Sequence, residues 1–398
     1  MRVAIVAGPD AGHAIPAIAL ALRFRDAGDA PVVFTGSRWL DVCSKNGIDA
    51  RLLPGLTPRA HDDDLDAGAR IHARAAHIAT ELLPELAAVS ADLVVADVLT
   101  VGGAMAAEQL GVPWIELSPH PLYAPSKGLP PIGTGLAPGV GLGGRIRDAL
   151  LRASTGRSLK KGRIQRAAAR ASIGLPVQET PPIARLIATL PALEVPRPDW
   201  PDDAYVVGPL LWEPTEQVLG APPGDAPLVM IAPSTAVTGA AGMLESAIEG
   251  LAGADVRVVA SVLDERPAAL RDGTAADWVR AGLGRQDVML AQAVVAVCGG
   301  GHGMLAKALL HGVPVVVVPG GGDQWELANR AVRQGSAVIV RPPSPDSLRQ
   351  AVETVLTDPS YAAAAQAAAR SAGQVMDPVQ VCHDALARAT SATVEQCD

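Results

Sequence analysis

The apolar positions of the first 120 residues fall into short runs separated by longer amphipathic segments. Four runs rich in Val, Ile, Leu and Ala predict buried strands: Val3–Ala7, Pro31–Thr35, Leu93–Ala96 and Pro113–Leu117. Segments with helical spacing lie between them, over Ile15–Ala27, Trp39–Asn46 and Gly102–Leu110. Because strand and helix signals alternate, the pattern predicts a parallel sheet with helices on both faces.

The same alternation restarts after residue 227. Five further runs predict strands, over Leu228–Ala232, Val256–Ser261, Val294–Cys298, Val313–Pro319 and Ala337–Val340. Helical segments accompany them, over Met243–Leu251, about Gly303–Leu310, Glu326–Gln334 and from Pro345 onward. This second series predicts a second α/β domain of similar design.

Composition shifts suggest where the domains meet. Pro and Asp are dense between Pro191 and Pro227, which is typical of a linker. We therefore expect a first domain over residues 1–205, a linker over 206–226, a second domain over 227–380 and a tail or helix over 381–398, for which a return to the first domain is one option. The predicted fold class is α/β, with two Rossmann-like parallel-sheet domains that face each other across a cleft. Ligands of such sheets bind beyond the carboxyl ends of the strands.

The overall composition excludes several functional classes. A chain of 398 residues with 49% hydrophobic residues has material for two cores. Its net charge of −8 argues against nucleic acid as a partner. No apolar run approaches the roughly 20 residues of a membrane span, and the four cysteines are far apart without metal-ligand spacing. We expect a cytoplasmic protein with reduced thiols and no integral membrane segment.

The segment 294–329 carries the strongest chemical signal. A strand runs into Gly299-Gly300-Gly301 and then into a helix, whose unpaired N–H groups and dipole favour a pyrophosphate. One strand later, Asp323 and Gln324 follow three glycines, and their side chains suit the hydroxyls of a sugar. The alternative is that the glycine turn is an ordinary one and that Asp323 merely caps a helix.

This segment resembles the donor-binding motif of family 1 glycosyltransferases, including the bacterial enzymes that glycosylate macrolides and glycopeptides. The matching residues are Gly300, Gly301, Gly303, Gly312-Val313-Pro314, Asp323-Gln324 and Asn329. The resemblance implies the GT-B fold. It further implies that Gly300, Gly301, Gly303 and their neighbours hold the donor diphosphate, and that Asp323 and Gln324 bind the donor sugar.

The chain departs from that motif at several positions. The motif His falls on Gly299, and His302, three residues on, is a candidate to replace its phosphate contact. Lys307 stands where plant members place a ribose-binding Glu. The upstream Trp-x-Pro-Gln reads Leu283-Gly284-Arg285-Gln286, so only Gln286 is kept as a donor-binding candidate. These departures leave the base, uracil or thymine, open.

A second group of candidates follows strands at other sheet positions. Gly12-His13-Ala14-Ile15-Pro16 is similar to the family's Gly-His-x-x-Pro, which makes His13 the general base that deprotonates the acceptor. By the same resemblance Asp97 orients His13, with a loop-capping role as the alternative. Ser234 and Thr235 correspond to donor-binding residues, with capping of the next helix as the alternative.

Together these residues predict an inverting glycosyltransferase that moves a hexose from a UDP- or TDP-sugar to a hydroxyl of a small, apolar acceptor. We expect the acceptor in a cleft walled by residues 55–80 and 118–145. The nucleotide sugar is a co-substrate, and we expect no metal and no further cofactor. Two alternatives are a sugar-nucleotide epimerase of the same fold and a non-catalytic nucleotide-binding relative. A homodimer is compatible with the sequence.

Overall fold

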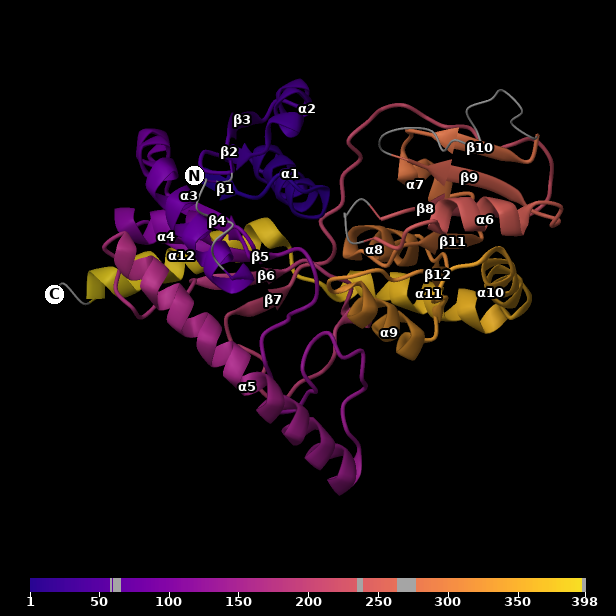
Figure 1. Ribbon diagram of the computed structural model, residues 1–398. Coiled ribbons are helices and arrows are strands. Elements are labelled where there is room, and N and C mark those ends of the chain that lie inside the picture. The colour runs from indigo at the N-terminus through magenta and orange to yellow at the C-terminus, as the bar shows by residue number, and fades with distance from the viewer. Residues whose placement is uncertain (58, 60–65, 235–238, 263–276, 396–398) are drawn as a thin grey trace.

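The computed structural model describes residues 1–57, 59, 66–234, 239–262 and 277–395, which form two lobes (Figure 1). The first lobe contains a seven-stranded parallel sheet in the order β3-β2-β1-β4-β5-β6-β7. Its strands are β1 (Arg2–Val6), β2 (Ala30–Thr35), β3 (Asp49–Leu52), β4 (Leu93–Asp97), β5 (Trp114–Ser118), β6 (Ala184–Ile187) and β7 (Ala204–Val206). Its helices are α1 (Ala11–Asp26), α2 (Leu40–Lys45), α3 (Ala67–Val89), α4 (Val101–Leu110) and α5 (Gly141–Ser172).

Alternation along β1 builds two cores on the two faces of this sheet. Val3 and Ile5 pack with α1 on one face, and Ala4 and Val6 pack with α3 and α4 on the other. All four side chains are fully buried. A strand that is apolar on both faces is the signature of a sheet covered by helices on both sides.

The second lobe repeats the design with a six-stranded parallel sheet in the order β10-β9-β8-β11-β12-β13. Its strands are β8 (Leu228–Ala232), β9 (Arg257–Ser261), β10 (Val279–Gly282), β11 (Val295–Cys298), β12 (Val315–Val317) and β13 (Ala337–Ile339). Its helices are α6 (Met243–Leu251), α7 (Gln286–Leu290), α8 (His302–Leu310), α9 (Gln324–Gln334), α10 (Pro345–Thr357) and α11 (Pro359–Ser371). The predicted architecture of two parallel-sheet domains is therefore confirmed.

The last helix, α12 (Pro378–Glu395), leaves the second lobe and lies on the first (Figure 1). Val381, Cys382 and Ala385 are buried in the core that α1 shares with the first sheet. His383 reaches back to Asp29, with 2.7 Å between Nε2 and Oδ2. The C-terminal helix thus ties the two lobes together, and the chain that leads into it runs beside the first linker residues, with the Met376 amide bonded to the Val206 carbonyl.

The described helices include none that is both long and apolar enough to cross a bilayer. Cys43, Cys298 and Cys382 are buried and free.

Candidate functional site

The order of strands reverses once in each sheet, and the candidate residues lie at both reversals. In the first sheet the reversal falls between β1 and β4, which are paired neighbours. In the second it falls between β8 and β11. Such switch points leave a crevice at the carboxyl ends of the strands, because the following loops diverge in opposite directions.

His13 and Asp97 meet at the first switch point. His13 lies in the first turn of α1, just after β1, and Asp97 is the last residue of β4. Their Nδ1 and Oδ2 atoms are 2.7 Å apart. The other carboxylate oxygen of Asp97 accepts hydrogen bonds from the Leu99 amide at 3.0 Å and the Thr100 hydroxyl at 3.3 Å. One carboxylate oxygen of Asp97 therefore caps the loop while the other contacts His13, so loop capping and contact with His13 do not exclude each other.

The surroundings of His13 set its protonation. Burial lowers the pKa of the imidazole, but the hydrogen bond and negative charge of Asp97, with smaller contributions from Asp10 and Asp323, outweigh it, and the pKa lies above the usual 6.5. A hydrogen bond from Nδ1–H to Asp97 leaves Nε2 as the atom that can take a proton. Tyr123, which lines the same cavity as Asp97, donates a hydrogen bond to Asp323, so the second lobe comes close to this switch point.

The glycine turn lies at the second switch point, between β11 and α8. A side chain at Gly299 would meet the Cβ atom of Ser234 at 2.8 Å, which explains why no residue larger than glycine fits there. Gly300 has a φ of +79°, a conformation that L side chains rarely adopt. A Cβ atom placed at Gly301 or Gly303, in contrast, would meet no atom of the described residues within 4 Å apart from the adjoining backbone. The first turn of α8 is therefore accessible to an anion.

Asp323, Gln324 and Ser234 gather around this turn. The N-cap residue of α9 is Asp323, but its side chain makes no capping hydrogen bond. Gln324 accepts from the Gly320 amide at 2.8 Å and donates to the Ser234 hydroxyl at 3.1 Å. The N-cap of α6 is Gly242 rather than Ser234. The simple capping alternatives for Asp323 and Ser234 are thus not observed, and Thr235 lies outside the described residues.

His302 is placed differently from Gly301 and Gly303. Its ring is buried, with Nε2 2.9 Å from the hydroxyl of Thr189, which follows β6 in the first lobe. Burial, reinforced by the nearby His120, lowers the pKa of His302 to about 3, so the ring is neutral. Its contact with phosphate remains a prediction, and that contact would have to replace its contact with Thr189 or its hydrogen bond with the Pro119 backbone.

Gln286 belongs to a buried polar network below the glycine turn. Its amide donates to Ser261 at 3.1 Å and its oxygen accepts from Lys307 at 2.9 Å. The Lys307 ammonium forms an ion pair with Glu213, with 2.5 Å between Nζ and Oε1. Glu213 comes from the linker and was missed in the sequence, because it lies 94 residues from its partner. The lysine that replaces the family's glutamate thus faces a carboxylate supplied from elsewhere in the chain.

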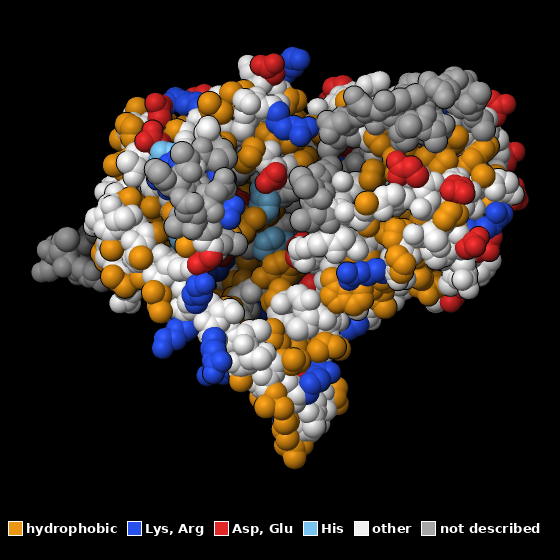
Figure 2. Space-filling model, viewed as in Figure 1, with side chains coloured by type: hydrophobic (Ala, Val, Ile, Leu, Met, Phe, Trp, Pro, Cys, Tyr) orange, Lys and Arg blue, Asp and Glu red, His pale blue; other side chains and the backbone are white. Residues whose placement is uncertain are grey.

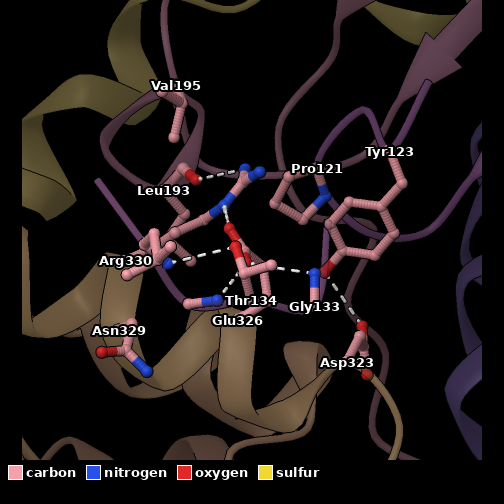
Figure 3. A network of polar contacts seen from close by, with 12 residues as sticks. Pro121, Tyr123, Gly133, Thr134, Leu193, Val195, Asp323, Glu326, Asn329 and Arg330 are labelled. Atoms are coloured by element: carbon pink, nitrogen blue, oxygen red, sulfur yellow. Dashed lines mark hydrogen bonds and ion pairs between the residues drawn. The ribbon is translucent and has the colours of Figure 1, made fainter. Parts of the chain in front are cut away.

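A network across the cleft was also missed (Figure 3). Tyr123, in the loop after β5, donates its hydroxyl hydrogen to Asp323 at 3.0 Å. Glu326 on α9 accepts from the amides of Gly133 and Gly135 at 3.2 and 3.0 Å. Arg330 pairs with Glu326 at 3.1 Å and donates to the Leu193 carbonyl at 3.1 Å. The sequence offered one hint of this network: Tyr123, one of three tyrosines in the chain, lies in a loop rich in Pro and Gly.

A cavity of about 620 Å³ opens beside the catalytic candidates in the first lobe. Asp97 and Tyr123 line one end, and the apolar wall includes Val101 and Met105. Glu116, whose pKa is raised by burial, gives the cavity a polar side. Of the expected acceptor wall 118–145, residues 118, 120, 122, 123 and 124 line this cavity. No described residue of the other expected wall, 55–80, lines it, and residues 58 and 60–65 lie outside the described part.

Known proteins share the family features and the fold of this chain. Residues 247–387 match the family model described as the C-terminal domain of erythromycin biosynthesis protein CIII-like proteins. The 4'-demethylrebeccamycin synthase of Lentzea aerocolonigenes is 28% identical over 90% of this chain and 93% of that protein. Two solved structures share the fold: the calicheamicin glycosyltransferase CalG4 (TM-score 0.73, 18% identity, 98% of each chain) and the spinosyn rhamnosyltransferase SpnG complexed with thymidine diphosphate (0.67, 18%, 96% of this chain and 99% of that one).

We predict that Asp97→Asn lowers the pKa of His13 below 6.5, because burial then acts without the carboxylate that opposes it. NMR titration of the imidazole measures this shift, with His13→Ala to assign the signal. In the unsubstituted protein the raised pKa stabilises the fold most below the unfolded-state pKa, and this contribution is lost as the pH rises through the folded-state value. An unchanged pKa in Asp97→Asn would mean that Asp97 does not control the imidazole.

Proposed function

We propose that this GT-B glycosyltransferase moves a hexose from UDP or TDP to a hydroxyl of a small natural product, with inversion at the anomeric carbon. One observation carries the proposal: the His13–Asp97 pair lies at the carboxyl ends of strands of the first sheet, close to Asp323 of the second lobe. Tyr123 lines the same cavity as Asp97 and donates a hydrogen bond to Asp323. A base is thus available on one side of the cleft and an anion site on the other. The structural neighbours CalG4 and SpnG are named as a glycosyltransferase and a rhamnosyltransferase, which favours transfer over the epimerase and the non-catalytic alternative.

The proposed reaction is a single in-line displacement. Nε2 of His13 takes the proton of the acceptor hydroxyl while its oxygen forms a bond to the anomeric carbon. The bond from that carbon to the diphosphate oxygen breaks, and its electron pair leaves with the diphosphate. Asp97 holds the tautomer and stabilises the imidazolium that forms. Attack opposite to the leaving group inverts the configuration.

The donor diphosphate is proposed to bind the first turn of α8. Gly301 and Gly303 leave this turn open, and its amides together with the helix dipole meet the charge that develops on the leaving group. We propose that these groups suffice without a metal or other cofactor. SpnG was solved with thymidine diphosphate, which supports a nucleoside diphosphate here and leaves UDP and TDP as the two candidates.

The donor sugar is proposed to contact Asp323 and Gln324. Asp323 already accepts a hydrogen bond from Tyr123, so a sugar hydroxyl would share or replace this contact. Gln324 is held by Gly320 and Ser234, which keeps its position relative to the glycine turn. Tyr123 therefore joins the candidates for sugar recognition.

The acceptor is proposed to occupy the cavity beside Asp97. Val101, Met105 and Leu122 suit an apolar body, whereas the partly exposed Glu116 and Arg185 suit a polar group at the far side. A hydroxylated ring system of a natural product combines both properties, and a volume of about 620 Å³ accommodates it. We further propose a cytoplasmic location, which the free thiols support, and a homodimer.

We predict that His13→Ala lowers kcat for transfer about 10²–10⁴-fold, because the acceptor loses its base, while donor binding is retained. Release of UDP or TDP from their sugars, with a panel of phenolic, macrolide and steroid alcohols, measures transfer. Thermal shifts with UDP and TDP measure binding, since a ligand of the folded state raises Tm. Transfer by His13→Ala at the rate of the unsubstituted enzyme would refute the mechanism.

We predict that Val101→Trp raises KM for the acceptor on the order of tenfold or more, because the indole fills the cavity beside Asp97. Val101→Ile is the matched control that keeps the helix and most of the space. The thermal shift with UDP or TDP should be the same in both variants, since the donor binds the other lobe. Equal acceptor KM values in the two variants would show that the acceptor does not bind in this cavity.

A further inference from the structure

Helix α5 presents its apolar side to solvent, which reverses the usual arrangement. Its outward residues include Leu142, Ile146 and Leu150, which are 77%, 51% and 67% exposed. Their spacing of four residues places them along one stripe of the helix. Asp148, which lies between them in sequence, points inward and is buried. Surface helices normally turn the apolar stripe toward the core, so this stripe calls for a partner outside the lobe.

The stripe lies at a projecting tip. The amino-terminal half of α5 extends away from both lobes (Figure 1), and Figure 2 shows hydrophobic side chains gathered along that tip. The preceding loop adds Val140, 91% exposed, and Leu136. This loop is fixed to the helix, since the Gly139 amide donates to Asp148 at 2.7 Å and Arg147 donates to the Ala137 carbonyl at 2.7 Å. Hydrogen bonds between the loop and the helix therefore hold the tip in a defined conformation.

The charge around the stripe is of one sign. Lys161, Arg166 and Arg170, toward the C-terminal end of α5, pair with acids from other elements. Residues 141–172 contain in all nine Lys or Arg and one acid, in a chain whose net charge is −8. That acid is the buried Asp148. Arg145, Arg157 and Lys160 are exposed along the helix, beside or beyond the apolar residues. The tip thus combines exposed apolar groups with positive charge in an otherwise acidic protein.

We infer that the tip of α5 docks on the surface of an anionic lipid bilayer. Leu142, Ile146 and Leu150 would enter the boundary between headgroups and acyl chains, while the basic side chains contact the lipid phosphates. Arg and Lys have apolar stems long enough to keep their charges at the headgroups. The helix would lie on the membrane and not cross it.

Charge complementarity favours lipid over a second copy of the chain. A symmetric dimer through this surface would set the same patch against itself. Arg145, Arg157 and Lys160 of one copy would then face the same residues of the other, and like charges at close range repel. An anionic bilayer instead offers the opposite charge and an apolar interior together.

Vesicle flotation with the full-length protein tests the inference. We expect binding to vesicles of phosphatidylcholine with phosphatidylglycerol, weak binding to phosphatidylcholine alone, and release at about 1 M salt, where the Debye length falls to about 3 Å. The double variant Leu142→Ser/Leu150→Ser should lower the partition coefficient about tenfold or more, because each buried leucine contributes that much. Arg157→Gln/Lys160→Gln should lower it about fivefold per charge.

The double variant Val177→Ser/Val218→Ser is the matched control, since both valines are exposed (67% and 59%) and lie away from the tip. It should bind vesicles as the unsubstituted protein does, and unchanged Tm values would show that all variants fold. Failure of the unsubstituted protein to bind anionic vesicles would overturn the inference. So would equal binding by the leucine variant. Self-association without vesicles that Leu142→Ser/Leu150→Ser abolishes would assign the tip to a second copy instead.

Discussion

The carboxyl ends of the two parallel sheets face each other, and the whole candidate site depends on that arrangement. His13 and Asp97 end or follow strands of the first sheet, and the glycine turn and Asp323 follow strands of the second. Neither set suffices by itself: one lobe holds a base without an anion site, and the other holds an anion site without a base. The chemistry therefore requires the lobes to be held at a defined distance.

Contacts of α9 hold the lobes in this relation. Glu326 and Arg330 are both buried, and each charge is met by the other and by groups of the first lobe (Figure 3). Buried charges that lose a partner are costly, so the interface resists small displacements. Tyr123 differs, because its partner Asp323 is also the proposed sugar ligand. Donor binding is thus coupled to the contact between the lobes at this point.

Local sequence signals predicted the parts of the site that depend on neighbouring residues. β8 and α6 have the predicted bounds, and the glycine turn lies between the predicted strand and helix. The strands β3, β7 and β10 were not predicted, since each is a short edge strand that buries few residues. The short interior strand β6 and the helix α3 were not predicted either. The sequence did not predict the roles of Tyr123, Thr189 and Glu213, because their partners lie 94 to 200 residues away. No local pattern encodes such pairings.

The central claim is that the first turn of α8 holds the donor diphosphate, and calorimetric titration of UDP and TDP tests it most directly. Gly303→Asp is the informative variant, because the site has open space for the side chain and an acid in the first turn stabilises a helix. Gly303→Ser is the uncharged control. We expect at least one of the two nucleotides to bind the unsubstituted protein and Gly303→Ser with similar affinity. The same nucleotide should bind Gly303→Asp about a hundredfold more weakly, since the carboxylate repels the diphosphate. Equal affinity for all three proteins, or no binding of either nucleotide, would contradict it.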